Sequence, residues 1–141
     1  MHNIHKEVKY KNCIYIYTNQ HRSLQNSDKS LWTISEVDEL NCFQLMYDNN
    51  WICDTYSGWS LHKVRSSNEY LGKSQPPKSE QVKIAKFVDS SKNSKWHGFP
   101  VDYRNSLNDR PKASILTKWV ENRDITKPQM SKILRGKICY L

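Results

Sequence analysis

The sequence has few residues of the kinds that mark fibrous, low-complexity or membrane-spanning chains. Only four of its 141 residues are glycine and five are proline, which excludes collagen-like and low-complexity organisation. No segment approaches the roughly 18 consecutive apolar residues that a transmembrane helix needs, and the first residues contain no hydrophobic signal core. We therefore expect a soluble, cytoplasmic protein without a membrane partner.

The cysteines are too widely spaced for the usual metal or disulfide patterns. Cys13, Cys42, Cys53 and Cys139 are separated by 28, 10 and 85 residues, which matches neither paired zinc ligands nor a compact disulfide framework. Three of them lie in apolar runs, where a thiol packs as a small hydrophobic group. We expect four reduced structural cysteines, no metal and no cofactor. A zinc site formed by Cys42, Cys53 and His62 is the alternative.

Aromatic side chains are abundant. Five tryptophans, eight tyrosines and three phenylalanines supply the bulky apolar material that disordered chains lack. The length is typical of one domain with its own core. We predict a single domain over residues 1–141, with a mainly β portion in 1–104 and a helical portion in 105–141.

Positive charge is concentrated in the second half of the chain. The formal net charge is +8, and it divides into +3 for residues 1–27, −5 for residues 28–62 and +10 for residues 63–141. Aromatic residues are interleaved with the lysines and arginines of the last segment. A basic surface that only keeps the protein soluble is the simple explanation. The length of the biased segment and its aromatic residues favour a polyanionic partner.

Alternating and β-branched residues in the first half indicate strands. Residues 8–17 are rich in β-branched and aromatic side chains, which favours a strand. Alternation on both sides of an Asp-Asn-Asn sequence predicts a β-hairpin over 43–55, and a further strand is predicted over 59–64. Residues 31–40 fit either the capped start of a helix or a strand, and we favour extended structure there.

The second half begins with a strand and ends in two helices. Residues 82–88 have the apolar character of a strand that is covered on both faces. A helix is predicted from residue 108 or 109 through 122, with an early proline that the first turn tolerates. A second helix is predicted to begin with a capping box formed by Thr126 and Gln129 and to stop at Gly136.

These elements together predict the fold class. We expect an α+β fold, with a small curved antiparallel sheet of about five to six strands followed by two short C-terminal helices. The final residues, Ile138–Leu141, are expected to add an edge strand or to pack on the core.

The preferred functional hypothesis is binding of RNA or DNA through phosphate contacts and aromatic stacking. The basic half supplies the cations, and the rings among them supply surfaces on which bases can stack. The two C-terminal helices also resemble a helix-turn-helix unit, whose second helix would lie near base edges. The residues predicted to contact nucleic acid are Lys83, Lys86, Lys92, Lys95, Trp96, Phe99, Arg110, Lys127, Gln129, Lys132, Arg135 and Lys137.

The segment around His97 suggests an alternative, a metal-independent ribonuclease of the toxin kind. It holds an imidazole, a carboxylate, a phenol and a guanidinium group within a few residues. His97 would act as the general base or acid, and His62 as a second proton carrier. Arg104 would stabilise the charge that develops on the phosphorane, and Tyr103 would donate a hydrogen bond or stack.

The ribonuclease hypothesis requires a turn at Gly98-Phe99-Pro100, because in a strand His97 and Asp102 would point to opposite faces. The simpler explanation is that this segment caps the core. Glycine-rich phosphate loops, serine elbows and zinc-protease motifs are missing. A third hypothesis is a protein-interaction module, such as an inhibitor or immunity protein, anchored by exposed tryptophan and tyrosine. The sequence leaves open whether the protein is an enzyme.

Overall fold

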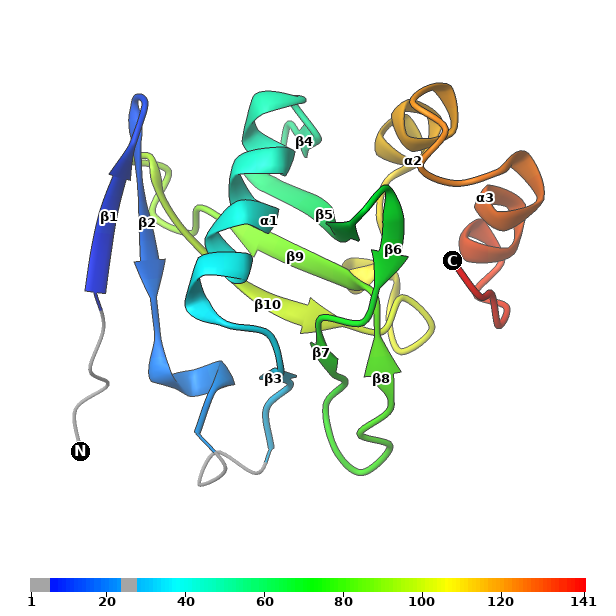
Figure 1. Ribbon diagram of the computed structural model, residues 1–141, viewed down its shortest axis with the longest axis horizontal. Helices are drawn as coiled ribbons and strands as arrows, with labels where there is room; N and C mark the ends of the chain where they lie inside the picture. Colours follow the sequence, from blue (N-terminus) through cyan, green and yellow to red (C-terminus); the bar gives the residue numbers. More distant parts are fainter. Residues whose placement is uncertain (1–5, 24–27) are drawn as a thin grey trace.

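The described part of the chain, residues 6–23 and 28–141 of a computed structural model, folds into two β-sheets and three α-helices (Figure 1). The larger sheet has seven strands and the smaller has three. The α+β class and the two short C-terminal helices are thereby confirmed. The elements are β1 (Lys6–Tyr10), β2 (Cys13–Tyr17), η1 (Asn19–His21), β3 (Leu31–Trp32), α1 (Glu36–Asp48), β4 (Ile52–Cys53), β5 (Ser57–Val64), β6 (Ser67–Glu69), β7 (Gly72–Lys73), β8 (Gln81–Val82), β9 (Ile84–Val88), β10 (Lys95–Val101), η2 (Leu107–Asp109), α2 (Ala113–Glu121) and α3 (Lys127–Leu134).

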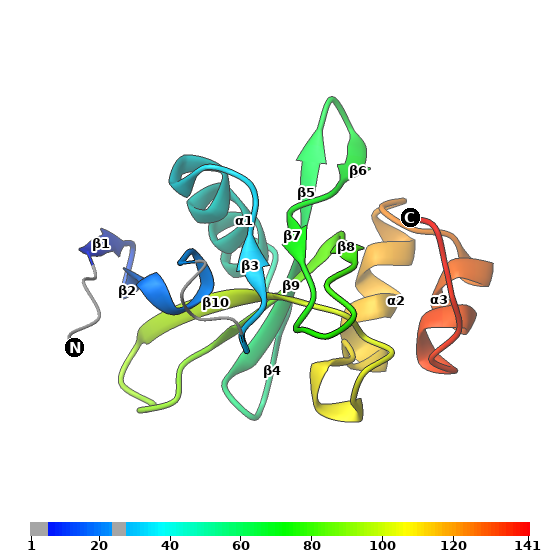
Figure 2. The same ribbon diagram turned by 90° about the horizontal axis from the view of Figure 1, so that it is seen from below.

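The larger sheet is mixed rather than wholly antiparallel. Its strands lie in the order β1-β2-β10-β9-β5-β4, and β6 pairs with the end of β5. Strands β10 and β2 run parallel, with Trp96 opposite Tyr15. They are far apart in the sequence, so no local pattern indicates that they pair. Figure 2 shows α1 on one side of the sheet and η2 on the other, with α2 and α3 at its far end.

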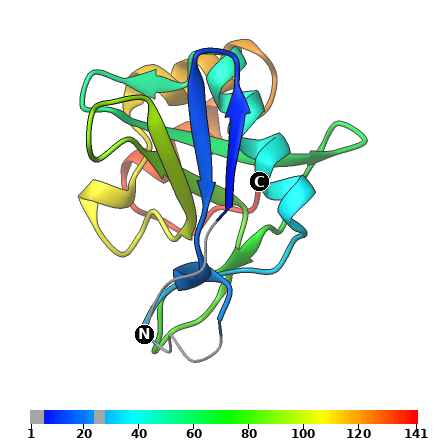
Figure 3. The same ribbon diagram turned by 90° about the vertical axis from the view of Figure 1, so that its left-hand side faces the viewer.

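Residues 8–17, predicted as one strand, form most of a β-hairpin (Figure 3). In this hairpin β1 and β2 are antiparallel, and Tyr10 lies opposite Cys13. The turn consists of Lys11 and Asn12, and Lys11 has a φ of 53°, in the left-handed region. Because β-forming residues continue on both sides of this short polar turn, the sequence pattern predicts one strand where the structure has two.

The predicted β-hairpin over 43–55 is wrong, because its first half belongs to helix α1. Ser35 caps this helix, and its hydroxyl accepts a hydrogen bond from the backbone N–H of Asp38 at 3.1 Å. Acidic residues fill the first turn, where they stabilise the helix dipole. Extended structure over 31–40 is wrong from residue 36 onward, and only Leu31–Trp32 form a short strand.

Two periodicities overlap in this segment. Phe43, Leu45 and Tyr47 alternate with polar residues as they would in a strand, and over so short a run the alternation is ambiguous. The spacing of three and four residues among the side chains that α1 buries is the helical one. Those buried residues are Glu39, Cys42, Phe43 and Met46.

The core between α1 and the sheet is built from aromatic rings. The ring centroid of Phe43 lies 4.8 Å from that of Tyr15 and 5.7 Å from that of Phe87. The Phe43 centroid is also 6.1 Å from the ring of Trp96, which is 5% exposed. Trp96, a predicted nucleic-acid contact, therefore lies in the core. On the same strand, a Cβ at Gly98 would lie 2.2 Å from the Phe87 ring, so only glycine allows this packing.

The first C-terminal helix starts later than predicted. Helix α2 begins at Ala113, after the 3-10 helix η2 and a short extended segment. A residue that precedes proline avoids the helical conformation, and Arg110, before Pro111, has φ −81° and ψ 129°. Because α2 starts late, η2 lies against the sheet instead of joining the helix. The carbonyl oxygen of Asp109 in η2 accepts the indole N–H of Trp59 on β5 at 2.9 Å.

The start of α3 is confirmed in its details. The hydroxyl of Thr126 accepts the backbone N–H of Gln129 at 3.2 Å, and the Gln129 side chain accepts the Thr126 N–H at 2.8 Å. Gly136 follows the helix with a φ of 67°, the left-handed conformation expected of a helix stop. The final residues form no strand, and Cys139 and Leu141 pack against the core.

Removing the cap of α3 is expected to destabilise the protein. The substitution Thr126→Ala leaves the N–H of Gln129 without its acceptor and should lower the free energy of unfolding by about 1 kcal/mol. Thr117→Ala is the control, because the Thr117 hydroxyl bonds only to the Ala113 carbonyl oxygen within α2. Urea denaturation of both variants tests this, and equal stabilities would contradict the role of the cap.

No helix of the described residues has the length and apolar character to cross a membrane. The longest of these helices is α1, which has 13 residues. At a rise of about 1.5 Å per residue, such a helix spans about 20 Å, against about 30 Å for the hydrocarbon core of a bilayer.

Candidate functional site

The face of the larger sheet that is turned away from α1 carries the candidate site. Side chains alternate between the two faces along a strand, and Phe87 of β9 packs against α1. Its neighbours Lys86 and Val88 therefore point to the opposite face, as do the residues paired with them on β5 and β10. This far face consists of Ser57, Trp59, Leu61, Ile84, Lys86, Val88, His97, Phe99 and Val101.

Lys86 lies in the middle strand of the far face, in one row with Trp59 and Phe99. It is only 5% exposed. Its Nζ donates a hydrogen bond to the carbonyl oxygen of Asn108 at 2.6 Å and lies 5.4 Å from the centroid of the Trp59 ring. These contacts hold the ammonium group between the sheet and the η2 segment.

The Lys86 ammonium is buried without an anionic partner. No carboxylate of the residues that the structure describes lies within 4.0 Å of its Nζ. Burial lowers the pKa of Lys86, and of the nearby charges Asp109 raises this pKa while Lys112 lowers it. A buried cation of this kind reduces the stability of a fold. Lys86 is therefore better suited to holding an anionic ligand than to stabilising the protein.

Lys86 borders a cavity of about 350 Å³, which we call the lysine pocket. Lys92 lines it from the loop after β9, and Lys112 lines it from the start of α2. Tyr56 and Ser57 line it from the beginning of β5. Three lysines from separate segments of the chain thus line one cavity.

One acidic residue, Asp89, is among those that line the lysine pocket. Its two carboxylate oxygens accept backbone N–H groups of its own loop, from Asn93 at 3.2 Å and from Ser94 at 2.8 Å. Asp89 therefore fixes the loop that carries Lys92. With three lysines and one aspartate among its lining residues, the pocket has a formal charge of +2.

Two residues at the rim of the lysine pocket have unusual backbone conformations. Tyr56 has a φ of 60° and Lys92 a φ of 56°, both in the left-handed region, where a bulky residue costs about 1–3 kcal/mol. The two segments are joined, because the carbonyl oxygen of Tyr56 accepts the N–H of Asp89 at 2.9 Å. The Nζ of Lys92 lies 5.5 Å from the centroid of the Tyr56 ring.

Two of the predicted catalytic residues, His97 and His62, lie on opposite faces of the sheet. His97 is on the far face, with its ring centroid 6.4 Å from that of Phe99. His62 points toward α1, where its Nδ1 lies 4.0 Å from the Sγ of Cys42. The two imidazoles cannot act on one substrate from these positions.

The other two predicted catalytic residues follow the far end of β10 and are bonded elsewhere. The Arg104 guanidinium pairs with the carboxylates of Asp102 and Glu80. The Tyr103 hydroxyl donates to the carbonyl oxygen of Lys137 at 2.5 Å, and burial raises the pKa of Tyr103 to about 12. Strand β10 runs straight through the predicted turn at residues 98–100. The four predicted catalytic side chains are therefore not brought together.

Sequence analysis missed a second histidine on the far face, His21. Its ring stacks on Phe99, with centroids 5.1 Å apart and an interplanar angle of 22°. Its Nδ1 lies 2.9 Å from the carbonyl oxygen of Ser30, an acceptor that places the proton on Nδ1. Burial lowers the pKa of both His21 and His97, so both imidazoles favour the neutral form near pH 7.

Three of the predicted nucleic-acid contacts lie in or next to the lysine pocket. Lys86 and Lys92 line the pocket, and Phe99 lies beside Lys86 on the neighbouring strand. Lys95 is exposed at the start of β10.

The remaining predicted contacts are dispersed over the rest of the molecule. Arg110 donates to the carbonyl oxygen of Leu134 at 3.1 Å, and Gln129 belongs to the capping box of α3. Figure 2 shows α3 on the outer side of α2, away from the sheet. The predicted contacts that are exposed on α3 or just after it are Lys127, Lys132, Arg135 and Lys137.

A second cavity, of about 310 Å³, lies under the final residues 138–141 and is called the tail cavity here. The charged side chains that line it already have partners. Arg104 pairs with Asp102 and Glu80, and the Nζ of Lys83 donates to the carbonyl oxygen of the last residue at 2.8 Å. With two cations and two carboxylates among its lining side chains, the tail cavity has a formal charge of zero, against +2 for the lysine pocket.

Sequence analysis also did not select Tyr56, Ser57 and Lys112 as site residues. Each had a weak signal, since Tyr56 and Ser57 lie between the hairpin predicted over 43–55 and the strand predicted over 59–64, and Lys112 belongs to the basic half. Their meeting depends on the pairing of β5 with β9 and on the late start of α2, which are not local properties.

The zinc alternative needs Cys42, Cys53 and His62 in one place. Cys42 and His62 face each other, but the Sγ of Cys53 lies on β4 and is 2.9 Å from the hydroxyl oxygen of Thr55. Within residues 6–23 and 28–141, no three His, Cys, Asp or Glu side chains gather as metal ligands. The four cysteines are free thiols.

Comparisons with known protein families, curated proteins and solved structures find no match to this chain. Fold and site define an α+β protein with a lysine-lined pocket on one face of a mixed sheet. Any functional conclusion has to follow from the chemistry of that pocket.

Proposed function

We propose that the protein binds nucleic acid, and that the lysine pocket holds its phosphate groups. The observation that carries this proposal is the convergence of Lys86, Lys92 and Lys112 on one cavity. Phosphate oxygens are the commonest partners of such clusters in nucleic-acid-binding proteins. A bound phosphate would supply the anion that the buried Lys86 lacks and would reduce the repulsion among the three ammonium groups.

Aromatic residues next to the pocket fit the second part of the hypothesis, base stacking. Tyr56, which lines the pocket, is 44% exposed, and the face of its ring that Lys92 does not cover is the one on which a base would stack. Trp59 is 1% exposed and so cannot stack on a base; its ring packs under the Lys86 ammonium group. A cytoplasmic location, where both RNA and DNA are within reach and thiols stay reduced, belongs to the same proposal.

The two other hypotheses gain less from the structure. The ribonuclease needs four side chains that lie apart, as described above. The interaction module was expected to use exposed tryptophan and tyrosine as anchors. All five tryptophans are buried, so only exposed tyrosines such as Tyr56, Tyr70 and Tyr140 are left for that role. We therefore place nucleic-acid binding ahead of both.

Charge removal from the lysine pocket should weaken binding and its dependence on salt. We expect Lys92→Gln/Lys112→Gln to lower the affinity for a short single-stranded RNA or DNA by about tenfold and to reduce the salt slope by about two. The measurement is fluorescence anisotropy across a series of salt concentrations. Lys73→Gln/Lys78→Gln is the control, since both of these lysines are exposed outside the pocket.

A third variant tests the rival location on α3. Lys127→Gln/Lys132→Gln removes the same charge from that helix and should change the affinity less than the pocket variant does. A larger loss from the α3 variant would place binding on the C-terminal helices. An affinity that does not respond to salt, or no binding at low salt, would overturn the proposal as a whole.

A further inference from the structure

The three lysines of the pocket differ in burial, because Lys92 and Lys112 are exposed and Lys86 is only 5% exposed. The carbonyl oxygen of Asn108 covers the Nζ of Lys86 from the η2 side, so a phosphate that reaches Lys86 must enter below the exposed lysines. A phosphate in the middle of a strand is flanked by two sugars, both of which would have to enter with it. A phosphate at the end of a strand carries one sugar, and that sugar can remain at the rim beside Tyr56.

The charge of the pocket also fits a terminal phosphate. Three lysines against Asp89 give a formal +2. A phosphomonoester carries about −1.5 to −2 charges near pH 7 and has three strong acceptor oxygens. A phosphodiester within a strand carries a single charge and has only two free oxygens. Three ammonium donors are therefore matched by the monoester and exceed what the diester needs.

The size of the pocket leads to the same ligand class. A volume of about 350 Å³ lies at the lower end of the range for small-ligand pockets. Such a cavity takes one terminal residue of a strand rather than several consecutive nucleotides. The exposed ring of Tyr56, with Lys92 above it, is placed to stack on the base of that residue.

We infer that the lysine pocket recognises the end of a nucleic-acid strand through its terminal phosphomonoester, with Lys86, Lys92 and Lys112 bound to the phosphate oxygens. This inference rests on the proposed function, since it assigns the part of the nucleic acid that the pocket holds. The 5′ and 3′ phosphates share this chemistry, and the experiment distinguishes them.

The test compares three forms of one short, internally labelled oligonucleotide, made as RNA and as DNA. One has a 5′-phosphate, one a 3′-phosphate, and one has hydroxyl groups at both ends. At fixed salt, we expect one phosphorylated form to bind at least about tenfold more tightly than the hydroxyl form. Lys86→Met should reduce this ratio toward one. Lys118→Met, which removes a lysine bonded to the carbonyl oxygen of Asn50, should preserve it.

The outcomes separate the inference from the proposed function. If all three forms bind equally well and the Lys92→Gln/Lys112→Gln variant still weakens them, nucleic-acid binding stands and recognition of the strand end is refuted. If a phosphorylated form is preferred but the preference survives Lys86→Met in a folded variant, the end is recognised elsewhere and the inference is also refuted. If no form binds at low salt, both proposals fail.

Discussion

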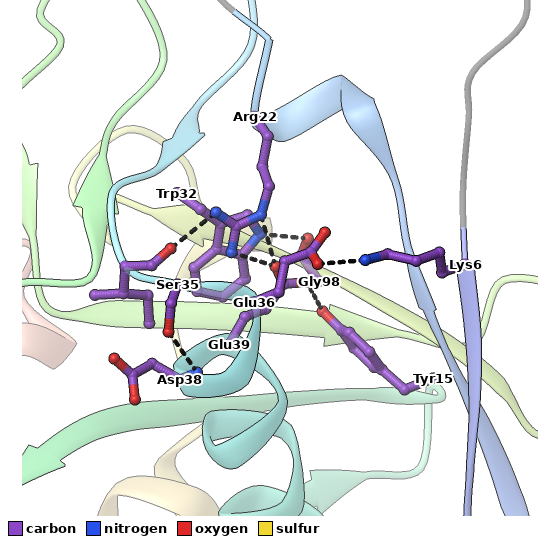
Figure 4. A network of polar contacts seen from close by, with 10 residues as sticks. Lys6, Tyr15, Arg22, Trp32, Ser35, Glu36, Asp38, Glu39 and Gly98 are labelled. Atoms are coloured by element: carbon purple, nitrogen blue, oxygen red, sulfur yellow. Dashed lines mark hydrogen bonds and ion pairs between the residues drawn. The ribbon is translucent and has the colours of Figure 1, made fainter.

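Glu39→Ala should lower the free energy of unfolding by about 3 kcal/mol. Glu39 is 2% exposed and links three segments of the chain (Figure 4). The Tyr15 hydroxyl donates to one of its carboxylate oxygens, and the Arg22 guanidinium donates to the other at 2.7 and 3.1 Å. Alanine would leave the buried Tyr15 hydroxyl without an acceptor and would remove the partner of Arg22.

A matched control lies one turn earlier in the same helix. Glu36 pairs with Lys6 at 2.6 Å, but both side chains are exposed, so Glu36→Ala should cost less than about 1 kcal/mol. Glu39→Gln should lose less than Glu39→Ala, because the amide oxygen can still accept from Tyr15. Guanidinium denaturation of the three variants measures these losses in the free energy of unfolding. Equal losses for Glu36→Ala and Glu39→Ala would show that the buried network does not stabilise the fold.

Lys86→Met should lower the affinity for a single-stranded oligonucleotide by about ten- to a hundredfold, the range for loss of one buried charged hydrogen-bond donor. The same substitution should leave the protein at least as stable as the parent, because methionine replaces a buried cation that has no carboxylate within 4.0 Å among the described residues. Loss of binding combined with retained stability is the pattern of a residue kept for its ligand. Anisotropy and urea denaturation measure the two effects.

The difference in stability between the parent and this variant should also change with pH in a defined direction. Burial places the pKa of folded Lys86 below that of the unfolded chain, so the folded state carries the full cost of the charge at neutral pH. As the pH rises through the folded pKa, the proton leaves and the cost disappears. The parent should therefore gain stability relative to Lys86→Met as the pH rises from neutral through the folded pKa toward the unfolded value near 10.5. A difference that stays constant or widens would contradict a buried, charged Lys86.

Locally encoded features of the fold could be predicted from the sequence. The capping box at Thr126 and Gln129 fixes the start of α3 through contacts within four residues, and it was found at the correct place. The strand predicted over 59–64 was also found as part of β5, which begins two residues earlier, at Ser57, after a turn of residues 54–56. In both cases the information lies in neighbouring residues.

Features that depend on distant parts of the chain could not be predicted. Helix α1 was missed because Phe43, Leu45 and Tyr47 satisfy a strand pattern, and only packing against Tyr15 and Phe87 decides between the two. The parallel pairing of β10 with β2 joins segments from opposite halves of the sequence. Such pairings are set by the whole fold.

The candidate site was predicted in part. Two of its cations could be predicted from the composition, since Lys86 and Lys92 belong to the basic segment that suggested a polyanionic partner. Ion pairs interrupt the positive charge of residues 63–141, since Lys63 pairs with Asp124 and Arg104 with Asp102. Burial of Lys86 without an anion, which singles out the pocket, is a property of the folded chain only.

The most direct test of the account is the location of bound nucleic acid on the folded protein. Backbone amide and lysine side-chain NMR signals can be followed while a short oligonucleotide is added. We expect the largest chemical-shift changes at Tyr56, Lys86, Lys92 and Lys112, with little change on α3. Shifts concentrated at residues 127–137, with the lysine pocket unaffected, would contradict it.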